Sequence, residues 1–168
     1  MDFNFEWASV GDTKSGRPTL GGKIDLVYYR LAMFSVKSIL EAQLGPEKAD
    51  EVFYRAGDAA GRAVYHKYLK GIKNLNEIVQ RLAAFFHEHN IGIFRIEKSN
   101  ETSGEFVFSM LEDVDCSGTA DVGKPRCKFD EGLIAGILGA YLGREVAVRE
   151  DECWGAGGKV CRFEAKAK

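Results

Sequence analysis

Residues 145–165 read EVAVREDECWGAGGKVCRFEA, and this stretch decides the carboxyl-terminal part of the fold. Two short segments that favour strands, residues 145–151 and 159–165, flank a glycine-rich turn and predict a β-hairpin. If Glu150 ends the first strand and Cys161 begins the second, the turn brings Cys153 and Cys161 to the same end of the hairpin. Glu150 lies three residues before Cys153, so its carboxylate can fold back toward that thiol. Three possible metal ligands therefore converge.

A fourth donor is needed, because zinc accepts thiolate sulfur and carboxylate oxygen in a tetrahedral arrangement. The two candidates are Cys116 and Cys127. We favour Cys127, because it immediately precedes a predicted helix whose amino-terminal dipole stabilises a thiolate. The residues alone leave three interpretations open: a metal site, buried thiols that pack as small apolar side chains, and a redox pair.

The amino-terminal half predicts three helices, each with a recognisable start or stop. Apolar positions recur at intervals of three and four over residues 25–44, and Gly45-Pro46 ends this helix and begins the next, which runs to about residue 69. Gly57 and Gly61 lie one turn apart on the second helix, where they permit the close approach of a neighbouring helix or leave room for a ligand. Asn74 is the expected N-cap of a third helix.

The period then changes from helix to strand. Residues 91–97 and 105–111 predict two strands joined by a turn at 98–104, and a polar segment, 112–126, follows them. A glycine-rich helix is expected at about 129–142, before the closing hairpin. Because strands and helices do not alternate regularly, the sequence predicts an α+β fold with a largely antiparallel sheet packed with helices.

Residues 1–23 differ in composition from the rest of the chain. They carry five glycine or proline residues among short apolar patches at Phe3, Phe5, Trp7 and Val10. This pattern predicts an extended arm, or a hairpin, that lies either on its own domain or on a second copy. The domain proper is expected to comprise residues 24–168.

Composition and charge exclude several classes of protein. With 168 residues, 23 basic and 25 acidic side chains and a net charge of −2, the chain lacks the global basic field typical of nucleic-acid binding. Its longest apolar run, about a dozen residues at 132–143, falls short of the ~20 that a membrane span needs. The amino terminus, MDFNFEW, does not resemble a signal peptide, so we expect a cytoplasmic protein whose four cysteines are metal ligands or buried thiols rather than disulfides.

The carboxyl-terminal pattern resembles the 4-vinyl reductase domain family. Its features are a cysteine ahead of a G-x-x-x-G helix, then E-x-x-C, a glycine turn and C-x-F, and the likeness extends over about residues 24–165. The matching residues are Cys127, Gly132, Gly136, Glu150, Cys153, Gly155, Gly158, Cys161 and Phe163. The resemblance implies a small-molecule-binding domain with bound zinc, a fold like that of TRAPP trafficking subunits, and a tendency to dimerise.

The resemblance also implies a ligand set for the zinc ion. The family's ligands fall on Cys127, Glu150, Cys153 and Cys161, whereas Cys116 matches no ligand. Three thiolates and one carboxylate fill the tetrahedron and leave no open position for water. The implied site is therefore structural rather than catalytic.

A ligand pocket is implied between the helices and the sheet, as in related sensors of aromatic compounds. Its candidate lining residues are Phe85, Phe86, Phe106, Phe108, Met110 and Tyr141, although an aromatic stripe of this kind is also typical of an ordinary core. The phenol-responsive members use a histidine and a tryptophan to hold the hydroxyl group, and Ile78 and Phe106 stand at those places here. A more apolar molecule than phenol is therefore expected.

These observations predict a zinc-stabilised homodimer that binds a small hydrophobic ligand without turnover and passes its signal to a separate downstream protein. The metal would tie the terminal hairpin to the glycine-rich helix and fix the roof of the pocket. Two alternatives are an interaction scaffold like the trafficking subunits, and a reductase of a tetrapyrrole vinyl group. The reductase would need a nicotinamide or flavin site, but no G-x-G-x-x-G follows a predicted strand.

Overall fold

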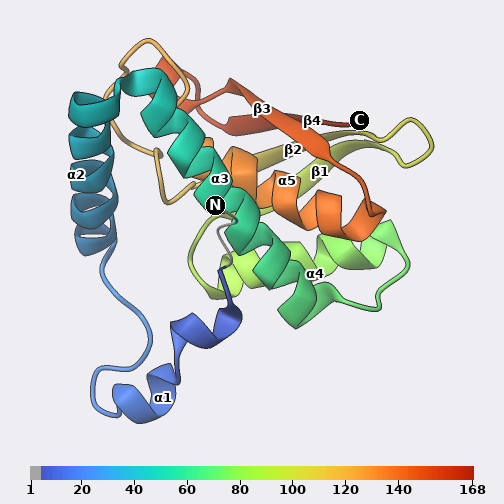
Figure 1. Cartoon of the computed structure of the whole chain (residues 1–168), viewed down its shortest axis with the longest axis horizontal. Helices are drawn as coiled ribbons and strands as arrows, with labels where there is room; N and C mark the ends of the chain where they lie inside the picture. Colours follow the sequence, from blue (N-terminus) through green and yellow to red (C-terminus); the bar gives the residue numbers. More distant parts are fainter. Residues whose placement is uncertain (1–4) are drawn as a thin grey trace.

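A four-stranded antiparallel sheet with helices packed on one face forms the body of the protein (Figure 1). The computed structural model describes residues 5–168, and the strands follow the order β1-β2-β4-β3. The strands are β1 (Ile93–Asn100), β2 (Glu105–Leu111), β3 (Val146–Glu152) and β4 (Cys161–Ala167). The helices are η1 (Trp7–Val10), α1 (Thr13–Gly16), α2 (Leu26–Leu44), α3 (Pro46–Val64) with its π-helical extension η2 (Tyr65–Leu69), α4 (Leu75–Glu88), α5 (Lys128–Leu142) and η3 (Trp154–Ala156). The predicted α+β class is confirmed.

The predicted helix boundaries are explained by local capping. The Asp25 carboxylate accepts a hydrogen bond from the Val27 amide at 2.8 Å, and Asn74 caps α4 in the same way. Pro46 occupies the first turn of α3, where an amide hydrogen would have no partner within the helix. The one clear shift in a strand is at β1, which continues to Asn100 and so into the segment predicted as a turn.

The amino-terminal segment is helical where the sequence predicts an extended arm. Within residues 5–23 the structure forms two short turns, η1 and α1, and the second is capped by the Asp12 carboxylate, which accepts from the Lys14 and Ser15 amides. Local capping thus outweighs the extended preference suggested by the glycines. Trp7 packs edge-on against Tyr68, with ring centroids 5.1 Å apart. Phe3 lies outside the described residues, and the boundary after residue 23 stays a prediction.

Close contact between two glycine-bearing helices organises the interior. Helices α4 and α5 pack against the sheet, and α3 crosses the outer side of α5 (Figure 1). A Cβ atom placed on Gly57 would lie 2.0 Å from the Phe129 carbonyl oxygen, and one on Gly132 would lie 1.9 Å from that of Tyr54. Since hydrogen is the only side chain that fits, the predicted close approach of helices at these glycines is confirmed.

Helix α2 stands at one edge of the molecule and contributes no buried residue (Figure 1). Its apolar stripe faces outward: Val27 is 66% and Leu31 65% exposed. The other large apolar side chains exposed on and just before this helix are Leu20, Ile24, Leu26, Tyr28, Val36, Ile39 and Leu44. None of the helices between residues 5 and 168 has the length and apolar character required to span a bilayer.

Candidate metal centre and apolar cavity

Five buried side chains from four parts of the chain converge at one end of the sheet. Period-two alternation turns Glu150 inward on β3, and Cys161 begins the inward-facing row of β4. Cys153 precedes the η3 turn between these strands, Cys127 is the N-cap of α5, and Cys116 lies in the segment that connects β2 with α5. One donor atom from each residue lies within 4.8 Å of the others. The structure thus brings together the four predicted ligands and adds Cys116.

The geometry of four of these donors suits a tetrahedral zinc ion. The Sγ atom of Cys127 lies 3.8 Å from those of Cys153 and Cys161. With Zn–S bonds of ~2.3 Å, two thiolates on one tetrahedral ion are separated by about 3.8 Å. Glu150 accepts a hydrogen bond from the Cys127 amide through Oε2 at 3.1 Å, while its buried Oε1 has no hydrogen-bond partner among residues 5–168. That free oxygen is available to a cation.

Cys116 occupies a different position relative to this tetrahedron. Its Sγ atom lies 3.0 Å from that of Cys161, which is well short of the separation between two ligands of one zinc ion. The contact instead suits a hydrogen bond between a thiol and the neighbouring sulfur. Spacing along the sequence left Cys116 open as a ligand, and the geometry assigns it to the surroundings of the site.

Burial makes the cluster unfavourable for negative charge. Desolvation is the main reason why the pKa of Glu150 is raised to about 8. Hydrogen bonds with the other thiols, first of all Cys116, lower the pKa of Cys153 and raise that of Cys127. One thiolate is thereby favoured over its neighbours, and full ionisation of the set requires a compensating cation.

A second group of buried carboxylates lies next to the cysteines. Asp113 Oδ1 accepts a hydrogen bond from the Asp115 amide at 2.7 Å, and Tyr29 donates its hydroxyl hydrogen to Asp115 Oδ1 at 2.6 Å. Asp130 lies in the first turn of α5 and is 2% exposed. Desolvation raises the pKa of Asp113 to about 7 and that of Asp130 well above its usual range. Sequence reasoning misses these residues, because 112–126 has the composition of a polar loop and only the paired D-V-D spacing marks it.

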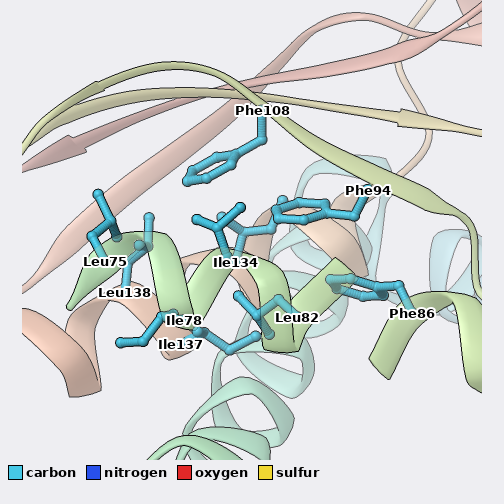
Figure 2. A pocket seen from close by; sticks show the side chains of 10 residues that line it. Leu75, Ile78, Leu82, Phe86, Phe94, Phe108, Ile134, Ile137 and Leu138 are labelled. Atoms are coloured by element: carbon cyan, nitrogen blue, oxygen red, sulfur yellow. The ribbon is translucent and has the colours of Figure 1, made fainter. Parts of the chain in front are cut away.

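An enclosed apolar cavity lies between α4, α5 and the first two strands (Figure 2). Its volume is about 10 Å³, roughly the space of one water molecule. Every lining side chain is aliphatic or aromatic: Leu75, Ile78, Val79, Leu82, Phe86, Phe94, Phe108, Ile134, Ile137 and Leu138. The cavity therefore offers shape and apolar surface but no hydrogen-bonding side chain.

Two of the six predicted pocket residues, Phe86 and Phe108, line this cavity, and the other four lie outside its wall. Phe85 follows the neighbouring direction on α4 and contacts the rings of Tyr68 and His89. Tyr141 donates its hydroxyl hydrogen to the Glu101 carboxylate at 2.9 Å.

The remaining two share the inward face of β2 with Phe108 but lie two residues to either side of it. Phe106 stacks on Phe108 from the far side, and Met110 pairs in register with Cys161, toward the metal centre. Ile78, which replaces the histidine expected of a phenol sensor, lines the cavity, whereas Phe106 does not.

The fold and site define a class: a small α+β domain that combines a buried cysteine and glutamate cluster with an apolar cavity. Residues 106–167 match the model of the 4-vinyl reductase domain. The chain is 30% identical over 148 residues to the uncharacterized protein MJ0150 of Methanocaldococcus jannaschii, an alignment that covers 88% of this chain and 79% of that protein. The chain belongs to the 4-vinyl reductase domain family. It is also 36% identical over 95 residues to MJ1642 of the same organism, and this match spans only 56% of either protein.

Three solved structures share the fold. The phenol-responsive sensory domain of the transcription activator PoxR superposes with a TM-score of 0.71 at 19% identity, over 88% of this chain and 78% of that one. A vinyl-4-reductase family protein from Methanocaldococcus jannaschii gives 0.63 at 18% identity, over 100% and 99% of the two chains. A trafficking protein particle complex subunit 3 from Naegleria fowleri, bound covalently to palmitic acid, gives 0.59 at 13% identity, over 86% and 97%. The predicted TRAPP-like fold is confirmed.

Proposed function

We propose that this chain is a zinc-stabilised sensory domain that binds a small hydrophobic molecule and responds by a change of packing, without catalysing a reaction. The observation that carries the proposal is the enclosed apolar cavity between α4, α5 and the sheet. The structure of the PoxR sensory domain with phenol supports it, because that domain has the same fold. A separate downstream protein would receive the signal.

The cavity lining determines the chemical class of the ligand. A hydroxyl group buried there without a hydrogen bond would cost roughly 2–7 kcal/mol, so a hydrocarbon-like molecule is favoured over a phenol. A volume of about 10 Å³ means that a ligand larger than water must displace side chains of α4 or α5 as it binds. No lining side chain can transfer a proton, which argues for binding rather than acid or base catalysis.

Zinc would act as a structural tie in this arrangement. Cys127 lies at the start of α5, while Glu150, Cys153 and Cys161 belong to the closing hairpin. The same helix supplies Ile134, Ile137 and Leu138 to the cavity wall (Figure 2). When bound, zinc would link the hairpin to α5, and four protein ligands would leave no position for a substrate.

Binding of an apolar probe tests the cavity. We expect toluene at millimolar concentration to raise the melting temperature of the wild-type protein measurably, because a ligand that binds only the folded state stabilises it. Native mass spectrometry of the freshly purified protein should also show any retained organic molecule. Val79→Phe, which fills the cavity, should abolish the shift, whereas Ala84→Phe on the exposed side of α4 should preserve it. An unchanged melting temperature in the wild type would favour the scaffold alternative instead.

The exposed apolar face of α2 supports a homodimer. Contiguous apolar surface of this kind marks an interaction site, and a second copy presents the same face in a two-fold arrangement. We expect the wild-type chain to elute with twice its mass of 18.6 kDa in size-exclusion chromatography with light scattering. Leu31→Asp should yield monomers, while Val122→Asp, the same change at an exposed position outside α2, should leave the dimer intact. A monomeric wild type would refute this part of the proposal.

A further inference from the structure

We infer that a second divalent cation binds beside the cysteine centre, between Asp113, Asp130 and Cys127. One ligand atom from each of these three buried residues lies within 4.8 Å of the other two. The inference goes beyond the proposed function, although it shares Cys127 with the zinc site described there. Two ions would then stand side by side, with the Cys127 thiolate between them.

The two carboxylates are prepared for a ligand that the protein itself does not supply. Asp113 is 1% and Asp130 2% exposed, yet Oδ2 of each has no hydrogen-bond partner among the described residues. Asp113 engages only its other oxygen, which accepts from the Asp115 amide. A buried carboxylate oxygen without a partner is costly, and a metal ion is one of the few groups that removes the cost.

Nearby basic side chains are committed elsewhere. Arg30 donates its hydrogen bonds to the carbonyl oxygens of Val114 and Ser117, at 2.8 and 2.9 Å. Lys37 pairs with Asp50 at 2.9 Å. Within residues 5–168, no ion pair reaches Asp113 or Asp130. Charge compensation for these carboxylates must come from a cation or from protons.

The chemistry of the three donors selects zinc. Carboxylate oxygen together with thiolate sulfur suits this borderline-soft ion better than magnesium or calcium, which prefer oxygen ligands alone. Asp130 follows Cys127 by three positions at the start of α5, a spacing that places both on one side of the helix. Asp113 approaches from the segment after β2, so the second ion would join this segment to α5.

Zinc stoichiometry tests the second site. The metal-free wild-type protein is saturated with zinc sulfate, desalted and analysed by native mass spectrometry and elemental analysis. We expect two zinc ions per chain in the wild type and one in Asp113→Asn/Asp130→Asn. Asp121→Asn/Asp151→Asn removes two exposed carboxylates as a control and should retain two. Two ions in the first double variant would overturn the inference.

The wild-type count separates this inference from the proposed function. One zinc ion per chain would refute the second site and leave the cysteine centre standing, because Asp113 and Asp130 would then be neutralised by protons. No zinc at all would refute both. If the double variant fails to fold, titration of the metal-free wild type with Co²⁺ decides the question. Its thiolate-to-cobalt absorption should change up to two equivalents, and an end point at one would overturn the second site.

Discussion

Replacing Gly132 by alanine is expected to lower the melting temperature by about 10 °C. The added Cβ atom would lie 1.9 Å from the Tyr54 carbonyl oxygen, a backbone atom that cannot rotate away. Helices α3 and α5 would have to separate along their whole crossing, including at Gly57 and Gly61. Overpacking costs typically about 1–3 kcal/mol, and a clash with backbone belongs at the upper end of that range, which corresponds to roughly 10 °C for a chain of this size.

Gly139→Ala is the matched control, because it introduces the same methyl group into the same helix. There the nearest atom to the new Cβ would be the Arg144 carbonyl oxygen at 3.3 Å, so only a small adjustment is required. Alanine also favours the helical state over glycine by about 1 kcal/mol. Thermal unfolding followed by circular dichroism should show this variant within a few degrees of wild type. Equal melting temperatures for both variants would contradict the account of the crossing.

Much of the fold could be predicted because local signals and packing agree. Asn74, Pro46 and the glycines of the crossing each have a physical role that spacing reveals. The outward direction of α2 could not be predicted, since apolar periodicity indicates a helix without indicating what covers it. The amino-terminal turns were also missed, because a single capping carboxylate at Asp12 decides the conformation of a segment rich in glycine.

The metal centre was predictable to the extent that one hairpin builds it. Period-two alternation and a tight turn place Glu150, Cys153 and Cys161 together without knowledge of the rest of the chain. The approach of Cys116 and Asp113 depends on the path of an irregular segment, for which periodicity carries no information. The cavity wall depends on which of two adjacent aromatics, Phe85 or Phe86, turns inward, and an intermediate spacing does not decide between them.

Helix α2 and the metal centre are mechanically connected through the segment after β2. Tyr29 and Arg30 on α2 hold Asp115, Val114 and Ser117 by side-chain hydrogen bonds. Cys116 lies within this same segment and contacts Cys161. Loss of the metal would therefore loosen the support of α2, and the proposed dimer surface would become less ordered along with the hairpin.

Cys153→Ser is expected to bind one zinc ion fewer per chain than wild type and to melt about 10 °C lower. Serine keeps the size of the side chain but presents a hydroxyl group, which binds zinc poorly compared with a thiolate. A ligand present at a thousand times its dissociation constant stabilises the folded state by about 4 kcal/mol, and this contribution would be lost. Elemental analysis and thermal unfolding, each before and after treatment with EDTA, measure both effects. EDTA should lower the wild-type melting temperature toward that of the variant.

Cys116→Ser provides the control, because it makes the same chemical change at a buried cysteine 3.0 Å from Cys161. That separation is too short for two ligands of one tetrahedral ion, so this variant should keep the zinc content of the wild type. If Cys116→Ser lost the ion and Cys153→Ser retained it, the ligand set would be wrong. If both kept the wild-type zinc content and melting temperature, the cysteines would be packed thiols, and the link between the hairpin and α5 would depend on apolar contacts alone.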